Sequence, residues 1–270
     1  MGKFDGILLV SDCDGTLLSK NNEISADDVC SIKHFMDEGG RFAFATGRIA
    51  SELKVYNDLV RTNAPAICYN GAVIYDFETE KETVITCTGE DIVPFLESIE
   101  NDNPEIMIDI ISNNTIHYFR ENDSLKKHKS ISIGPFLEVE HYKKVPAPWL
   151  KIAAWGMPDD VKRLSVSART DLLPEGYEFV HSYEYCCELL FPGASKGNAL
   201  TELVKMLPDV KKVIAVGDNT NDILMLEKAD LSFVPANAVQ VAKDAADVVL
   251  ESDCNNSPLT EVIDYLEKKI

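Results

Sequence analysis

The fold is decided by an apolar run that ends in two carboxylates: Gly6-Ile7-Leu8-Leu9-Val10-Ser11-Asp12-Cys13-Asp14-Gly15-Thr16-Leu17. A short continuous apolar run is typical of a parallel strand that is covered on both faces. Ser11 and Asp12 end the run, and Gly15 allows a sharp turn after it. We therefore expect a buried strand with a pair of aspartates just beyond the edge of its sheet.

The sequence around this run alternates helix and strand patterns. A helical pattern begins at the N-cap Ser25 and stops at Gly39-Gly40, and apolar runs follow at 42–45 and 66–69. The same alternation returns near the end of the chain, with helical or strand-like segments at 200–207, 213–216, 223–226, 231–234 and 248–250 and a last helix from Pro258. The prediction is an α/β protein with a doubly wound, Rossmann-like parallel sheet, to which both ends of the chain contribute.

The middle of the chain has a different pattern. Strand-like segments lie in adjacent pairs with helical segments between them, which favours an α+β layer of its own. We predict a core domain made of residues 1–81 and 189–270, with a second domain, residues 82–188, inserted into it.

The composition excludes several classes of function. The chain has 26 Lys and Arg against 45 Asp and Glu, a net charge of −19, which repels nucleic acids and anionic membrane surfaces. No apolar stretch is long enough to span a membrane, and no secretory signal pattern is present, so a cytoplasmic location is expected. A small anion such as a phosphorylated metabolite remains a possible partner, because it needs only a local positive pocket.

Three other segments carry polar groups where a strand ends or a helix begins: Thr46-Gly47-Arg48, Ser195-Lys196-Gly197 and Gly217-Asp218-Asn219-Thr220-Asn221-Asp222. Each of them alone also fits a helix cap or a solvated loop. The carboxyl ends of parallel strands meet at one edge of a sheet, however, so these segments converge with Asp12 and Asp14. Carboxylates for a metal, combined with a hydroxyl, an amide and an ammonium group for an anion, indicate metal-assisted phosphoryl transfer.

These segments resemble, in order, the four motifs of the haloacid dehalogenase (HAD) superfamily. The carrying residues are Asp12-Cys13-Asp14-Gly15-Thr16-Leu17, Thr46-Gly47-Arg48, Lys196 and the run from Gly217 to Asp222. The large insertion, together with residues 70–75 and 195–197, is similar to the Cof-type members of subfamily IIB, which carry a C2 cap domain. The resemblance implies that residues 82–188 form such a cap.

The resemblance also implies roles for individual residues. Asp12 is the expected nucleophile, which forms an aspartyl-phosphate, and Asp14 is the expected general acid and base. Mg²⁺ is expected on the carboxylates of Asp12 and Asp218 and on the backbone carbonyl of Asp14. Thr46, Gly47, Lys196 and Asn221 are expected to bind the phosphoryl oxygens, and Asp222 to orient Lys196 or a metal-bound water.

The expected activity is Mg²⁺-dependent hydrolysis of small phosphomonoesters, sugar phosphates in particular, by a monomer or weak homo-oligomer. One alternative is a phosphohexomutase, which would hold a second phosphate in the inserted domain, where Arg120, Arg163 and Arg169 form no cluster in the sequence. Another is a catalytically silent binding protein, which would be expected to lack one of the paired aspartates.

Some residues are not expected to take part in catalysis. The seven cysteines are scattered without CxxC spacing, and we expect free thiols. The five histidines are expected at the surface or with satisfied partners, and the basic run Lys126-Lys127-His128-Lys129 in a solvated loop.

Overall fold

The computed structural model describes residues 2–132 and 134–269, and it divides into two compact units. Met1–Ile85 and Ser195–Ile270 form the first unit, and Thr86–Ala194 form the second. The junctions lie a few residues later in the chain than the boundaries predicted at 82 and 188. Strand β5 (Lys81–Val84) pairs with β4 (Val73–Asp76) of the first unit, whereas β11 (Cys186–Leu190) completes a sheet of the second.

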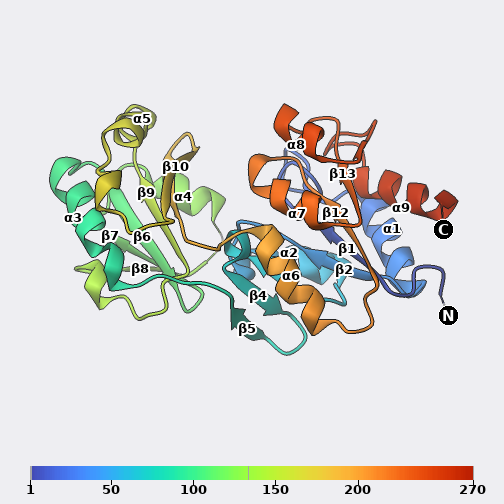
Figure 1. The fold of residues 1–270 in the computed structure, drawn as a ribbon. Coiled ribbons are helices and arrows are strands. Elements are labelled where there is room, and N and C mark those ends of the chain that lie inside the picture. The colour runs from blue at the N-terminus through green and yellow to red at the C-terminus, as the bar shows by residue number, and fades with distance from the viewer. Residues whose placement is uncertain (1, 133, 270) are drawn as a thin grey trace. The chain divides into compact units, whose positions relative to one another are not determined.

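The first unit is built on a five-stranded sheet in which all neighbouring strands are parallel (Figure 1). The strand order is β14-β13-β12-β1-β2, with bounds Val248–Val249, Leu231–Val234, Lys212–Val216, Ile7–Ser11 and Arg41–Phe44. Strand β1 therefore lies between one strand from each end of the chain. The predicted parallel α/β core is confirmed.

Helices cover this sheet on both faces. They are α1 (Ala26–Asp37), α2 (Ala50–Val60), α6 (Lys196–Met206), α7 (Ile223–Lys228), α8 (Gln240–Ala245) and α9 (Pro258–Lys269). Leu8 and Val10 of β1 share a core with Leu200 of α6 and Met225 of α7, whereas Leu9, which points to the opposite face, is fully buried as well. Burial on both faces explains why the strand is an unbroken apolar run.

The sequence pattern predicts that the apolar run at 66–69 continues the parallel sheet, and this prediction is wrong. Strand β3 (Ala66–Cys68) pairs antiparallel with β4, which pairs antiparallel with β5, in a separate three-stranded sheet. The chain reverses at Asn70 and Gly71, whose φ angles are 53° and 98°. A single parallel bridge from Ala45 to Ile67 keeps β3 next to the end of β2.

The second unit contains a six-stranded sheet with the order β10-β11-β9-β6-β7-β8. The bounds of these strands are Glu178–Tyr183, Cys186–Leu190, Lys151–Trp155, Met107–Ser112, Thr115–Phe119 and Phe136–Glu138. Helices α3 (Val93–Asp102) and α5 (Pro158–Ser167) pack on one face, and Leu125 of α4 (Leu125–Ile131) packs against residues of the other. This is the α+β layer that the sequence predicts.

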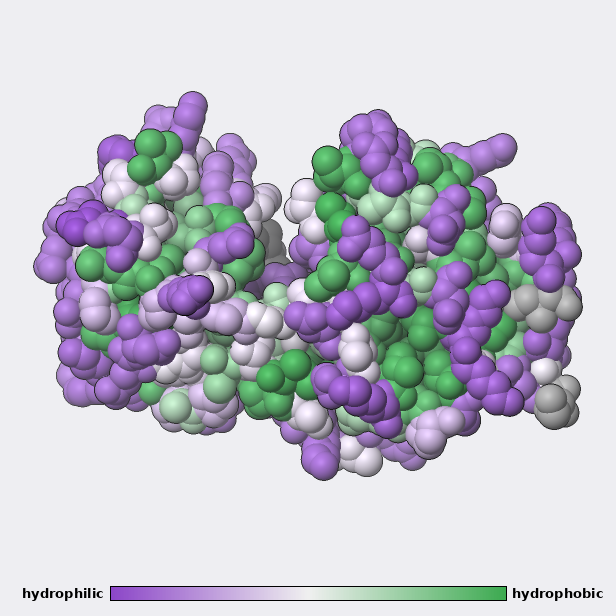
Figure 2. All heavy atoms as spheres, in the orientation of Figure 1, coloured by the Kyte–Doolittle hydropathy of each residue, from purple (hydrophilic) through white to green (hydrophobic). Residues whose placement is uncertain are grey.

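Hydrophilic side chains are spread over the visible face of each unit rather than gathered in one area (Figure 2). All seven cysteines are free thiols, as expected. None of the described helices is both long enough and apolar enough to cross a membrane.

The prediction of a solvated loop at Lys126–Lys129 is wrong, because these residues belong to α4. His128 is buried, stacks on Trp155 with a centroid separation of 3.8 Å, and lies 3.4 Å from the Asp109 carboxylate of β6. Its Nδ1 and the Oδ1 of Asp109 have no hydrogen-bond partner among the described residues, so His128 is not the satisfied or surface histidine that the sequence predicts. Leu125 and His128 lie one helical turn apart on the face of α4 that meets the sheet, which the cluster of lysines conceals in the sequence.

Burial changes the protonation of this pair in opposite directions. It raises the pKa of Asp109 to about 7, and together with the charges of Lys151 and Lys129 it lowers the pKa of His128 to about 3. The folded pair therefore holds one proton, on Asp109, from about pH 4 to 7. In the unfolded chain the same proton resides on the histidine up to its ordinary pKa near 6.5, so the two contributions to the pH dependence of stability largely cancel.

Removing one member of the pair is expected to expose the contribution of the other. In Asp109→Asn, His128 protonates only in the unfolded state, so the free energy of unfolding should rise between pH 5.5 and 7.5 relative to wild type, by on the order of 1 kcal/mol. In His128→Phe, Asp109 ionises only at a cost in the folded state, so the free energy of unfolding should fall over the same range relative to wild type. Urea unfolding at pH 5.5 and 7.5 measures the free energy of unfolding of wild type and of both variants. If this free energy changed with pH in the same way in the two variants, the placement of the proton on Asp109 would be contradicted.

Candidate active site

The candidate site lies at the carboxyl edge of the parallel sheet of the first unit. Ser11, the last residue of β1, is in register with Val216 of β12 and with Phe44 of β2. The residues that follow these strands are therefore neighbours at one edge. Two backbone hydrogen bonds fix the arrangement, from Asp12 N to Val216 O (2.8 Å) and from Ala45 N to Ser11 O (2.8 Å).

Lys196 connects the segments that meet there. Its Nζ donates to Asp12 Oδ1 at 2.6 Å and to Asp222 Oδ1 at 2.6 Å, and all three side chains are buried. Lys196 is the first residue of α6, and the Oγ of Ser195 caps this helix by accepting a hydrogen bond from Asn198 N (3.0 Å). A lysine at a helix N-terminus is unfavourable toward the helix dipole, and here the two carboxylates compensate it. Burial alone would lower the pKa of Lys196, but Asp12 and Asp222 raise it, so the ammonium stays charged.

Asp222 has both carboxylate oxygens engaged. Oδ1 accepts from Lys196, and Oδ2 accepts from the backbone N–H groups of Asp218 (2.9 Å) and Asn219 (3.0 Å). Asp222 thus holds the loop after β12 in a tight turn and orients Lys196 at the same time. Asp222 thus bonds to groups of the protein with both oxygens.

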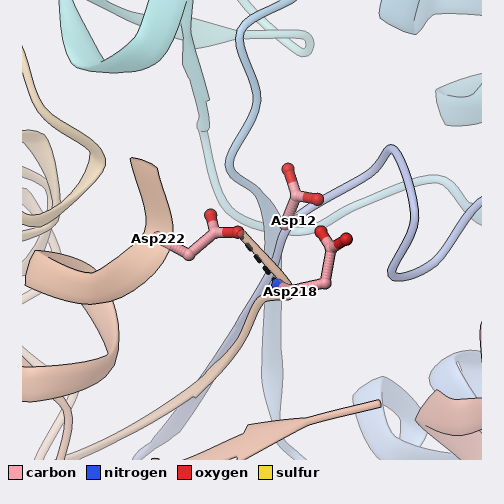
Figure 3. A group of neighbouring side chains, drawn as sticks. All are labelled: Asp12, Asp218 and Asp222. Atoms are coloured by element: carbon pink, nitrogen blue, oxygen red, sulfur yellow. Dashed lines mark hydrogen bonds between the residues drawn. The ribbon is translucent and has the colours of Figure 1, made fainter. Parts of the chain in front are cut away.

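The carboxylates of Asp12, Asp218 and Asp222 converge (Figure 3), with one oxygen of each within 4.8 Å of the others. Thr16 Oγ1 donates to Asp218 Oδ1 at 3.2 Å. Burial raises the pKa of Asp12 in spite of the nearby ammonium of Lys196, and burial together with the charge of Asp222 raises the pKa of Asp218 to about 6. Ionisation of all three carboxyl groups would leave negative charge in excess of the one positive charge of Lys196 at this point.

This donor set fits a hard divalent cation. Because Asp222 is engaged by Lys196 and by two backbone amides, Asp12 and Asp218 are the carboxylates with capacity left for a metal. Oxygen donors of this kind suit Mg²⁺ or Ca²⁺ rather than a soft metal, and a divalent cation would neutralise the excess negative charge.

The loop after β2 runs past the same edge. Thr46 is fully buried, and its Oγ1 accepts a hydrogen bond from Arg48 N at 3.1 Å, whereas its carbonyl oxygen accepts from Asn70 N at 3.0 Å. A Cβ on Gly47 would lie 2.9 Å from Asn70 Oδ1, so a larger residue here would displace the Asn70 side chain. Asn221 is exposed, and its Nδ2 donates to Asn70 Oδ1 at 3.1 Å. Asn70 thus links the loop after β2 to the loop after β12.

Asp14 stands apart from the acidic cluster. Its two oxygens accept hydrogen bonds from Arg48, Oδ2 from Nε at 2.8 Å and Oδ1 from the terminal nitrogen at 2.6 Å. Arg48 and Asn70 have no site role that the sequence predicts, although Arg48 directly follows Thr46-Gly47 and Asn70 begins the segment 70–75. Such assignments depend on which side chains meet in three dimensions, and neither spacing nor residue type indicates that.

Comparison with known proteins identifies the family. The family model of haloacid dehalogenase-like hydrolases matches residues 9–263. The chain is 28% identical over 254 residues to the putative phosphatase YxeH of Bacillus subtilis, a match that covers 91% of this chain and 93% of the relative. It is 26% identical over 263 residues to the pyridoxal phosphate phosphatase YbhA of Escherichia coli, covering 93% of this chain and 95% of that protein.

The fold also matches a known structure of this family. A haloacid dehalogenase-like hydrolase from Bacteroides thetaiotaomicron superposes with a TM-score of 0.85 at 22% identity, covering 96% of this chain and 98% of that structure. The family model covers most of both segments of the first unit and the whole of the second. The chain therefore belongs to the haloacid dehalogenase-like hydrolases, among their Cof-type phosphatases.

Proposed function

We propose that the protein is a Mg²⁺-dependent phosphatase that hydrolyses small phosphomonoesters through an aspartyl-phosphate on Asp12. The observation that carries the proposal is the buried ion pair between Asp12 and Lys196 beside the carboxylates of Asp218 and Asp222. It presents a fixed nucleophilic carboxylate, a positive charge for phosphoryl oxygens and a group of acids for a metal at one point.

The reaction divides into two displacements. A carboxylate oxygen of Asp12 attacks phosphorus, the bond from phosphorus to the ester oxygen breaks, and Asp14 gives a proton to the departing alcohol. Asp14 then takes a proton from water, which attacks the phosphorus of the aspartyl-phosphate and releases inorganic phosphate and free Asp12. Splitting the hydrolysis in this way lets one carboxyl group act as acid in the first step and as base in the second.

The other residues bind and orient. Lys196 holds Asp12 in one rotamer and places its ammonium beside the phosphoryl group, where Thr46, Gly47 and Asn221 supply further donors. Asp12 and Asp218, with the carbonyl of Asp14, would hold Mg²⁺, which when bound offsets the charge of the acids and of the phosphate. Asp222 keeps Lys196 and the loop after β12 in place.

The substrate class is a small phosphorylated metabolite, and we infer sugar phosphates. A relative named for pyridoxal phosphate supports a small monoester in general. We propose that the second unit, with its α+β sheet, is a C2-type cap that selects the leaving group. We propose that the protein acts in the cytoplasm as a monomer or weak homo-oligomer, and the net charge of −19 disfavours self-association.

The structure gives the phosphohexomutase alternative no support. A mutase would need a second phosphate site in the second unit, yet each arginine of that unit already pairs with acids. Arg120 pairs with Glu100, Arg163 with Glu105 and Asp160, and Arg169 with Asp171. The two relatives reported above are named as phosphatases.

Asp12→Asn is expected to lower phosphate release from p-nitrophenyl phosphate by about 10³-fold or more, because an amide oxygen is a poor nucleophile. Asp209→Asn is the matched control, since Asp209 makes an exposed ion pair with Arg41 at 2.7 Å and should keep wild-type turnover. Phosphate release by Asp12→Asn at the wild-type rate would refute the nucleophile assignment.

EDTA is expected to abolish phosphate release, and added Mg²⁺ to restore it. Asp218→Asn removes one of two metal-binding carboxylates, so the Mg²⁺ concentration for half-maximal rate should rise by about tenfold or more. Mg²⁺ should also raise the Tm of wild type more than that of Asp218→Asn, because binding to the folded state alone stabilises it. Full activity in EDTA, or an unchanged Mg²⁺ requirement in Asp218→Asn, would argue against the metal site.

A further inference from the structure

Arg48 holds the carboxylate of Asp14 with two parallel hydrogen bonds. Nε donates to Oδ2 at 2.8 Å, and the terminal nitrogen donates to Oδ1 at 2.6 Å. Bidentate pairs of this geometry define the orientation of a carboxylate more strictly than a lysine contact would. The pair joins the loop after β1 to the loop after β2, and both lie in the first unit.

Arg48 is itself held by groups other than Asp14. Its terminal nitrogen also donates to Asn22 Oδ1 at 3.1 Å, and its guanidinium carbon lies 5.6 Å from the centre of the Tyr56 ring. Tyr56 in turn donates from its hydroxyl to Asn22 O at 3.2 Å. The arginine therefore sits in a frame made by α2 and by the chain segment before α1.

The two partners differ in exposure. The Arg48 side chain is 15% exposed, whereas that of Asp14 is 51% exposed. A side chain that is anchored by several contacts and mostly buried is costly to displace, but a half-exposed aspartate can rotate. If the pair opens, Asp14 is the partner that moves.

The proposed chemistry requires the pair to open. An arginine only donates hydrogen bonds, so a carboxyl group with both oxygens on the guanidinium cannot direct its own O–H at a leaving group. To protonate an ester oxygen, Asp14 must free at least one oxygen from Arg48. The other bond can persist and keep the carboxyl group near its position of use.

We propose that Arg48 is the positioning residue for Asp14. Arg48 orients the carboxyl group through two hydrogen bonds while the site is empty, and during the first displacement Asp14 exchanges one of these bonds for the leaving-group oxygen. This inference rests on the proposed phosphatase function, and it assigns to Arg48 a role in proton transfer rather than in binding the phosphoryl group.

The test is the dependence of the rate on the leaving group. A nitrophenolate departs without protonation, whereas the alkoxide of a sugar phosphate needs a proton from the acid. The ratio kcat/KM reports the steps up to the aspartyl-phosphate, so the measurement compares kcat/KM for p-nitrophenyl phosphate and for a hexose 6-phosphate in wild type and in Arg48→Gln.

We expect kcat/KM of Arg48→Gln to fall at least about tenfold more for the hexose phosphate than for p-nitrophenyl phosphate, with Asp14→Asn showing the same selectivity. Tyr56→Leu, which removes part of the frame around Arg48, should change the ratio in the same direction by a smaller factor. Arg41→Gln is the matched control, because Arg41 makes its ion pair at the surface of the same unit. The Tm of each variant shows that it is folded.

Equal loss on both substrates would overturn the assignment, because it would mean that Arg48 binds the phosphoryl group or only supports the fold. Wild-type turnover that Asp12→Asn abolishes, measured in the same assay, supports the proposed function independently. Lack of any wild-type turnover would overturn the proposed function and the role of Arg48 together.

Discussion

The buried ammonium of Lys196 is the interaction on which the arrangement of the site depends. A buried charge is tolerated only when it is paired and hydrogen-bonded. Lys196 meets this requirement by donating to Asp12 and Asp222, which follow two different strands of the parallel sheet. The pairing therefore ties the start of α6 to the loops after β1 and β12. Residues that are 184 positions apart in the chain are thereby in direct contact.

The excess of acid over base at this point distinguishes a site from a structural ion pair. One lysine cannot neutralise Asp12, Asp218 and Asp222 together. Burial, and after it the neighbouring carboxylates, raise the pKa values of Asp12 and Asp218. Asp222 accepts hydrogen bonds from Lys196 and from two backbone amides, whereas Asp14 accepts two hydrogen bonds from Arg48. The four aspartates thus differ in their hydrogen-bond partners, and under the proposed function each takes a different part in phosphoryl transfer.

The sequence allowed the parallel core and the convergence of its loops to be predicted, because buried parallel strands read as apolar runs and their carboxyl ends must share an edge. The prediction for 66–69 is wrong because an apolar run fits a strand in either sheet. The tight turn at Asn70 makes β4 antiparallel to β3 and so places both in the separate sheet. The loop prediction for 126–129 is wrong because the three lysines indicate an exposed segment, and nothing in the sequence indicates that His128 contacts Trp155 and Asp109. The partners of Arg48 and Asn70 could not be predicted, since they come from segments whose approach is set by packing.

The most direct test of the account is a crystal structure of the protein grown with Mg²⁺ and beryllium trifluoride, a mimic of the aspartyl-phosphate. We expect the beryllium to be bonded to a carboxylate oxygen of Asp12, with Lys196 in contact with the fluorides and a cation held by Asp12 and Asp218. Binding of the trifluoride to any other residue, with Asp12 still bonded only to Lys196, would contradict it.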